Sequence, residues 1–248
     1  MSPSLDIEFE SLVASFHFSS TIALRSIMAQ SGAILSGSAA LVLLHSGSFS
    51  PRNLDFYVLP HGYSLFLSFV LDQGYVVEPD RDLSLAYERD VLLVLKLVHT
   101  DSGKEINVVT VLAGHVVHGI TGFHSTLVMN YVAWYGVVSL YPRWTLAKKG
   151  LIIRETATTT DCFEKYRARG FMCAKGNDIL CNSNLGVGGH LCQINLECPK
   201  ITRSLLDGNC DFQPFMGLSD KLAHFEPRDM SWVLPVPCVF PGQSACGK

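Results

Sequence analysis

The chain has 248 residues, of which 48% are hydrophobic and 17% charged, with a formal net charge of −3 and a pI near 6.3. This composition predicts a folded chain with a sizeable core and excludes a largely disordered protein. A protein that grips a long polymer by its phosphates normally carries a basic face, and none is visible, so we expect no binding to long nucleic acid.

The start of the chain and its apolar stretches predict a protein without a membrane partner. Asp6, Glu8 and Glu10 lie where a signal peptide would carry basic residues. The longest nearly apolar stretch, 33–44, is too short to cross a bilayer. We therefore expect a soluble, cytoplasmic protein, in which the cysteines that crowd the chain after residue 160 are reduced.

The first third of the chain alternates predicted helices and strands. Residues 1–31 have helical spacing, with Ser20 or Thr21 as a cap and Gly32 as the end. The elements expected next are a strand at 33–35, a helix at 39–45, a strand at 54–59 and a helix at 61–73.

A β-hairpin is the clearest local signal. Val91–Val98 and Glu105–Val111 are β-branched runs, and Asp101-Ser102-Gly103 between them is typical of a turn. The elements expected after it are a loop or short helix at 114–122, a helix at 124–136, a strand at 137–141 and a helix at 160–169, followed by short strands and loops.

Residues 33–58 combine features that suit a phosphate and a metal ion. Gly37 lets the backbone approach a ligand, and Ser38 places a hydroxyl at a helix N-terminus, which favours an anion. Asn53 and Asp55 are spaced i and i+2 on a strand and therefore share a face, where two carboxylates would hold Mg²⁺ against a triphosphate. A further carboxylate on a neighbouring strand would complete a two-metal site.

Gly37-Ser38 followed by Asn53–Val58 resembles the glycine-serine and paired-aspartate signature of the nucleotidyltransferase superfamily. Over roughly residues 20–172 the chain is also similar to a group of uncharacterised fungal proteins with a degenerate form of that signature. The segments that carry this second resemblance are Ile34–Leu41, Asn53–Val58, Phe123–Asn130, Leu140–Pro142 and Tyr166–Gly170. We expect an α+β fold: a small mixed β-sheet with packed helices over 1–155, then a helix and an irregular cysteine-rich segment over 156–248.

The carboxylate set of the superfamily signature is incomplete here. Asn53 replaces the first aspartate and Asn107 stands where the third is expected, so Asp55 alone is retained. Glu105 shares the strand face of Asn107 by period-two alternation and offers a substitute. A site with one or two carboxylates should bind metal more weakly than one with three.

The resemblance implies a nucleoside triphosphate as ligand and Mg²⁺ as cofactor. In this interpretation Gly37 and Ser38 hold phosphate, Asp55 holds Mg²⁺, and Glu105 or Asn107 assists, with transfer of a nucleotidyl group to an acceptor as a further expectation. The alternative is a catalytically inactive pseudoenzyme that serves as a protein-interaction module with a protein partner. A third hypothesis is an unrelated activity of the C-terminal cysteines and histidines.

Weaker patterns offer other ligands. The spacings of the cysteines and the histidine between residues 173 and 198 match no compact zinc motif, so we expect no zinc and free thiols. Gly186–Gly189 is interpreted as a loop, and Arg52 and Lys96 either meet a phosphate or are ordinary surface charges. The remaining candidates are His115-x-x-His118 with His124, and Cys173, Cys181, His190, Cys192 and Cys198.

Overall fold

The computed structural model describes residues 4–78, 90–175, 196, 198, 201–216 and 230–235. Contacts between residues divide the chain into two compact units. The first comprises residues 1–120, 130–139 and 212–226, and the second 121–129, 140–211 and 227–248. The domain boundary expected at residue 155 stays a prediction. In the described part of the chain, no helix has the length and apolar composition needed to cross a membrane.

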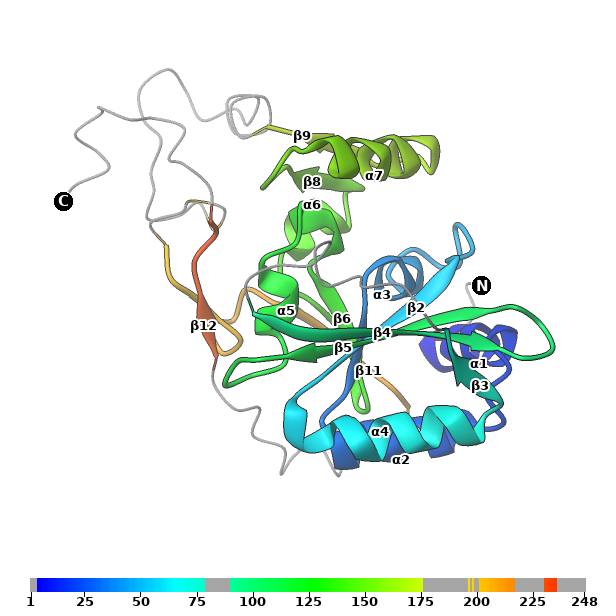
Figure 1. Ribbon diagram of the computed structural model, residues 1–248. Coiled ribbons are helices and arrows are strands. Elements are labelled where there is room, and N and C mark those ends of the chain that lie inside the picture. Colours follow the sequence, from blue (N-terminus) through cyan, green and yellow to red (C-terminus); the bar gives the residue numbers. More distant parts are fainter. Residues whose placement is uncertain are drawn as a thin grey trace, which may run out of the picture. The chain divides into compact units, whose positions relative to one another are not determined.

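A mixed eight-stranded sheet forms the centre of the first unit, in the order β11-β7-β6-β1-β2-β5-β4-β3 (Figure 1). β2 pairs β5 in parallel, whereas β1–β2, β1–β6, β3–β4, β4–β5 and β6–β7 pair antiparallel. The predicted α+β class with a mixed sheet is confirmed. The strands are β1 Ile34–Ser36, β2 Asn53–Val58, β3 Tyr75–Val77, β4 Val91–His99, β5 Glu105–Val111, β6 Asn130–Ala133, β7 Gly136–Ser139 and β11 Asp211–Pro214.

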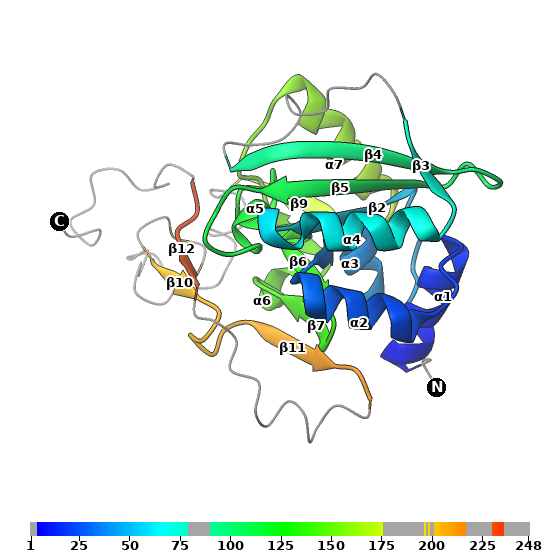
Figure 2. The ribbon, with the colours of Figure 1, turned by 60° about the horizontal axis from the view of Figure 1, so that its bottom comes forward.

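Two of the unit's helices, α2 and α4, lie side by side on one face of the sheet (Figures 1 and 2). The core between them and the sheet contains Leu54 and Phe56 of β2, Ile106 of β5, Met28 of α2 and Phe66 of α4, all nearly or fully buried. Burial of each such side chain contributes about 1.5–3 kcal/mol. The helices are α1 Leu5–Ser15, α2 Thr21–Ser31, α3 Ser38–Leu43, α4 Pro60–Asp72 and α5 His118–Thr121.

The N-terminal helical region is two helices rather than one. Phe16 and Phe18, both buried in the core, interrupt the helical path between α1 and α2. Ser20 caps α2 by accepting a hydrogen bond from the Ala23 amide at 3.2 Å, and Gly32 ends it in the left-handed region. The predicted cap and end are therefore confirmed.

The predicted hairpin is confirmed as β4 and β5, with Lys96 opposite Asn107 and Val98 opposite Glu105. Gly103 has a φ of 69°, as the turn requires. The strands expected at 33–35, 54–59 and 137–141 and the helices expected at 39–45 and 61–73 form with bounds shifted by one or two residues.

The helix predicted at 124–136 is wrong. Thr126–Val128 forms a 3-10 turn, and residues 130–133 form β6 between β1 and β7. All four residues of β6 are buried, and a short apolar run buried on both faces has no period that separates a strand from a helix. Pairing with β1, which is distant in sequence, and with the adjacent β7 decides that these residues form a strand.

The second unit holds two small sheets, β8–β9 parallel and β10–β12 antiparallel. The expected helix at 160–169 begins earlier, at Ala157, because Thr156 and Thr159 form a capping box. Arg203 is buried, pairs with Asp207 and lies over the rings of Tyr141 and Trp232. The elements are α6 Pro142–Thr145, β8 Lys149–Leu151, α7 Ala157–Ala168, β9 Met172–Ala174, β10 Arg203–Ser204 and β12 Ser231–Trp232, with the 3-10 turn Thr126–Val128.

Gly62 sets how closely α2 and α4 pack. A Cβ at Gly62 would lie 2.0 Å from the Ser31 carbonyl oxygen, which belongs to the helix backbone and cannot move aside alone. We expect Gly62→Ala to destabilise the protein by about 2–3 kcal/mol in urea unfolding. The matched control is Gly114→Ala, where a Cβ meets nothing within 4 Å. Equal effects of the two substitutions would contradict this packing account.

His124 makes the second unit sensitive to acid. Its ring packs against Phe163 and Tyr166, and burial, with a smaller contribution from the charges of Lys165 and Arg154, lowers its pKa to about 4. The unfolded value is about 6.5, so the folded state favours the neutral ring. This stabilisation is complete above pH ~6.5 and is lost as the pH falls toward 4, by on the order of 3 kcal/mol.

We therefore expect His124→Phe to flatten the pH dependence of unfolding between pH ~6.5 and 4. Urea unfolding across this range, with amide exchange of α7 as the local probe, measures it. A His124→Phe variant that loses stability with acid as steeply as the parent would refute the assignment.

Candidate functional site

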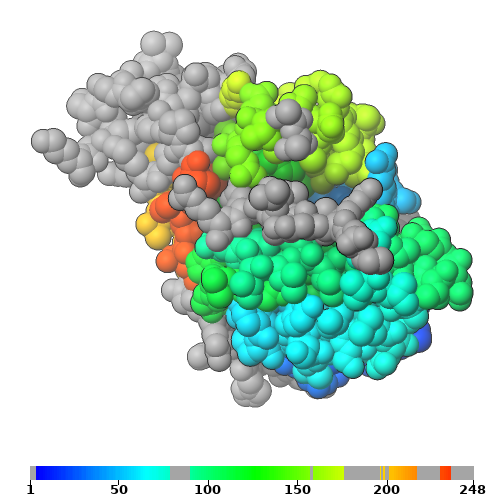
Figure 3. All heavy atoms as spheres, in the orientation of Figure 1, coloured from blue at the N-terminus to red at the C-terminus, as the bar shows by residue number. Residues whose placement is uncertain are grey.

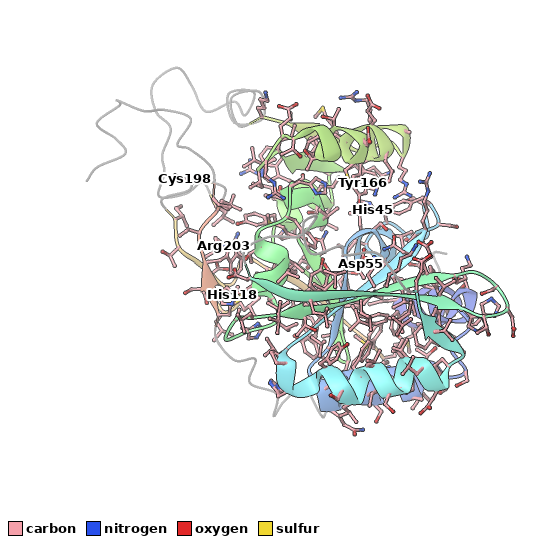
Figure 4. The ribbon with its side chains drawn as sticks, in the orientation of Figure 1. His45, Asp55, His118, Tyr166, Cys198 and Arg203 are labelled. Atoms are coloured by element: carbon pink, nitrogen blue, oxygen red, sulfur yellow. The ribbon has the colours of Figure 1, made fainter. Side chains whose placement is uncertain are left out.

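The polar residues of the predicted site share one face of the sheet at β2 and β5. The parallel register places Asn53 beside Glu105 and Asp55 beside Asn107. Leu54 and its neighbours two residues on point into the core, so the alternating residues, Asp55 among them, project from the other face. Figure 4 labels Asp55 on β2. The expectation that Asp55 and Asn107 meet is confirmed.

Gly37 brings the backbone against the Asp55 carboxylate. Ser36, at the end of β1, is the cross-strand partner of Asp55. Gly37 follows with φ 68° and ψ −141°, a conformation that other residues rarely adopt. A Cβ at this position would lie 3.0 Å from Asp55 Oδ2. Glycine is therefore required by the turn and by the close approach to the carboxylate.

The Asp55 carboxylate is held by amides. Asp55 Oδ1 accepts a hydrogen bond from Asn53 Nδ2 at 2.6 Å and another from Asn107 Nδ2 at 2.8 Å. Hydrogen bonds to a charged acceptor are stronger than those between neutral groups. These two donors stabilise the carboxylate without a metal ion, as aspartates at the same positions could not.

Asn107 also presents an oxygen without a donor. Its Oδ1 is buried and has no hydrogen-bond partner among the described residues. A buried acceptor without a donor costs about 1–3 kcal/mol, so this atom favours a cation or a donor group beside it. Asp55 and Asn107 thus offer oxygen ligands of the kind Mg²⁺ takes, with a single formal negative charge. The described residues contain no cluster of three His, Cys, Asp or Glu side chains that could hold a metal ion.

Glu105 is engaged by a lysine. Lys96 Nζ lies 2.8 Å from Glu105 Oε1 and 2.9 Å from Glu78 Oε2, and the lysine side chain is 10% exposed. The hydrogen bond to Glu105, and then that to Glu78, raises the pKa of Lys96 against the opposing effect of burial. Sequence reasoning treated Lys96 as a phosphate contact or a surface charge and did not consider Glu78. The hairpin register, which sets Lys96 opposite Asn107, was the available signal for the pairing of Lys96 with Glu105.

Ser38 begins α3, but the helix has only six residues and all of them are buried. Ser38 itself is 8% exposed. A helix this short contributes a smaller N-terminal dipole than a long one. Any role of Gly37 and Ser38 toward a phosphate therefore depends on the backbone N–H groups and the serine hydroxyl.

The weaker candidates make local contacts. His115 Nδ1 accepts a hydrogen bond from the Val117 amide at 3.2 Å, and His118, the first residue of α5, bonds to the His115 carbonyl at 3.3 Å. Cys173 and Cys198 are free thiols. Cys181, His190, Cys192 and the loop Gly186–Gly189 lie outside the described residues.

The contact between Gly37 and Asp55 is testable by a double-mutant cycle. Gly37→Ala should destabilise the protein by about 1–3 kcal/mol, because it strains the turn and presses a methyl group on the carboxylate. In an Asp55→Ala background the second cause is absent, so the same substitution should cost at least about 0.5 kcal/mol less. Urea unfolding of the four proteins measures this coupling. Purely additive effects would mean that backbone strain alone demands glycine.

Comparisons with known proteins add little to this geometry. No family model matches the sequence, and no curated protein matches it. Among solved structures, one described as "tRNA-processing enzyme (apo form I)" matches with a TM-score of 0.43 and 12% identity. The match covers 64% of this chain and 44% of that chain, so this chain spans less than half of that protein's length.

Proposed function

We propose that this protein binds a nucleoside triphosphate, together with Mg²⁺, on the sheet face around Asp55, and that nucleotidyl transfer there is weak. The observation that carries the proposal is the position of Asp55. It lies against the Gly37 backbone and beside Asn53 and Asn107, the two positions where the superfamily signature calls for carboxylates. The amide pair accounts for the weak transfer.

The chemistry follows from the donor set. Bound Mg²⁺ would neutralise phosphate charge. Asp55 would hold the ion with one carboxylate, after giving up an amide hydrogen bond, and Asn107 Oδ1 would supply a neutral oxygen. Gly37 and Ser38 would approach the phosphates through backbone N–H groups. One carboxylate balances less cation charge than three, so metal and nucleotide should be held loosely.

A second candidate function is that of a catalytically inactive protein-interaction module. Two observations favour it. The Asp55 carboxylate is already stabilised by two amides. The outer part of the first unit also carries large exposed apolar side chains on α4, β3 and β4, elements whose colours can be followed on the face shown in Figure 3. These side chains are Leu65, Leu71, Val76, Val77, Leu92 and Leu93.

Repair of the site tests the first proposal. Asn53→Asp with Asn107→Asp should lower the melting temperature without metal, because three carboxylates would repel one another. Mg²⁺ with a nucleoside triphosphate should recover this loss, so the repaired protein should gain more from the ligand than the parent. A ligand at one hundred times its dissociation constant adds about 2.7 kcal/mol.

The control is Asp55→Asn in the repaired background, which should abolish the gain. Thermal melts of the parent, the repaired protein and this control, with and without the ligand, measure all three responses. Identical responses would exclude this face as the binding site and would leave the interaction module as the better explanation.

A further inference from the structure

Lys96 lies on the same face of the sheet as Asp55 and pairs with two carboxylates. Its ammonium bridges Glu105 and Glu78 at 2.8 and 2.9 Å. The backbone keeps all three together, because Glu105 lies on β5 next to the strand that carries Lys96, and the Glu78 amide donates to the Lys96 carbonyl at 3.0 Å. The lysine side chain is 10% exposed, whereas those of Glu78 and Glu105 are 37% and 44% exposed, so solvent still reaches the carboxylates.

Asn107 connects this cluster to Asp55. Asn107 is the cross-strand partner of Lys96, and partners of this kind have their Cβ atoms roughly 4.5–5.5 Å apart. Its Nδ2 is directed at Asp55, while its buried Oδ1 has no donor among the described residues. The register places this acceptor on the same face as Glu105 and Lys96, and oxygen atoms of these kinds suit a cation.

We propose that the Lys96 ammonium is the resident cation of this face: it pairs with both Glu78 and Glu105 and so excludes a divalent metal ion from the space between these carboxylates and Asn107. The inference deepens the proposed function, since it states which carboxylates are withheld from Mg²⁺ and by which residue. Glu105 then cannot serve as the substitute metal ligand while Lys96 holds it.

Removal of the ammonium should open a metal site. Lys96→Gln leaves Glu78 and Glu105 without their cation on the face that also carries Asn107 Oδ1, and Mn²⁺ alone, with no nucleotide present, is the probe. We expect Lys96→Gln to bind at least one Mn²⁺ at least tenfold more tightly than the parent does, in isothermal titration calorimetry. Without metal, Lys96→Gln should melt at a lower temperature than the parent. We also expect Mn²⁺ to raise the melting temperature of Lys96→Gln.

Two further variants separate charge balance from shape. Lys96→Arg keeps the positive charge and should bind Mn²⁺ as the parent does. Lys96→Gln with Glu105→Gln removes one charge of each sign and should lose the gain in Mn²⁺ affinity. Mn²⁺ affinity of Lys96→Gln within threefold of the parent would overturn the inference, as would a Lys96→Gln protein that stays unfolded in saturating Mn²⁺. Because nucleotide is absent, these outcomes are independent of whether the parent binds a nucleoside triphosphate.

Discussion

The parallel pairing of β2 with β5 is the constraint on which the site depends. It brings Asp55 beside Asn107 and Asn53 beside Glu105, although about fifty residues separate the partners in sequence. The opposite face of the same two strands holds Leu54, Phe56 and Ile106 in the core, and a shift of one residue would expose them and bury the polar set. The free energy that fixes the core therefore also fixes which polar side chains can meet.

Hydrogen bonds and ion pairs among its own side chains stabilise the carboxylates of the polar face. Asp55 is stabilised by neutral amides, and Glu105 and Glu78 by an ammonium. Compared with carboxylates, amides at positions 53 and 107 lower the cost of folding without metal, and under the proposed function they would lower the affinity for metal for the same reason.

Sequence reasoning succeeded where the signal was local or lay on a face of fixed period. The β4–β5 hairpin, the Ser20 cap and the shared face of Asp55 and Asn107 are examples. It failed at 130–133, where burial on both sides of β6 removes the periodic pattern and pairing with β1 and β7 decides the structure. The bridge from Lys96 to Glu78 was beyond reach, because it depends on how the edge strand β3 pairs with β4.

These relations give the two asparagines different roles. Asn53 and Asn107 donate to the same oxygen of Asp55, yet Asn107 is also the neighbour of Lys96 across the hairpin. A carboxylate introduced at 107 would meet both the Asp55 anion and the Lys96 ammonium, whereas one introduced at 53 would meet the anion without that neighbour. The charge of this face is therefore set jointly by β2, β5 and β4, and under the proposed function the lysine on β4 decides how much of any added negative charge a metal ion would balance.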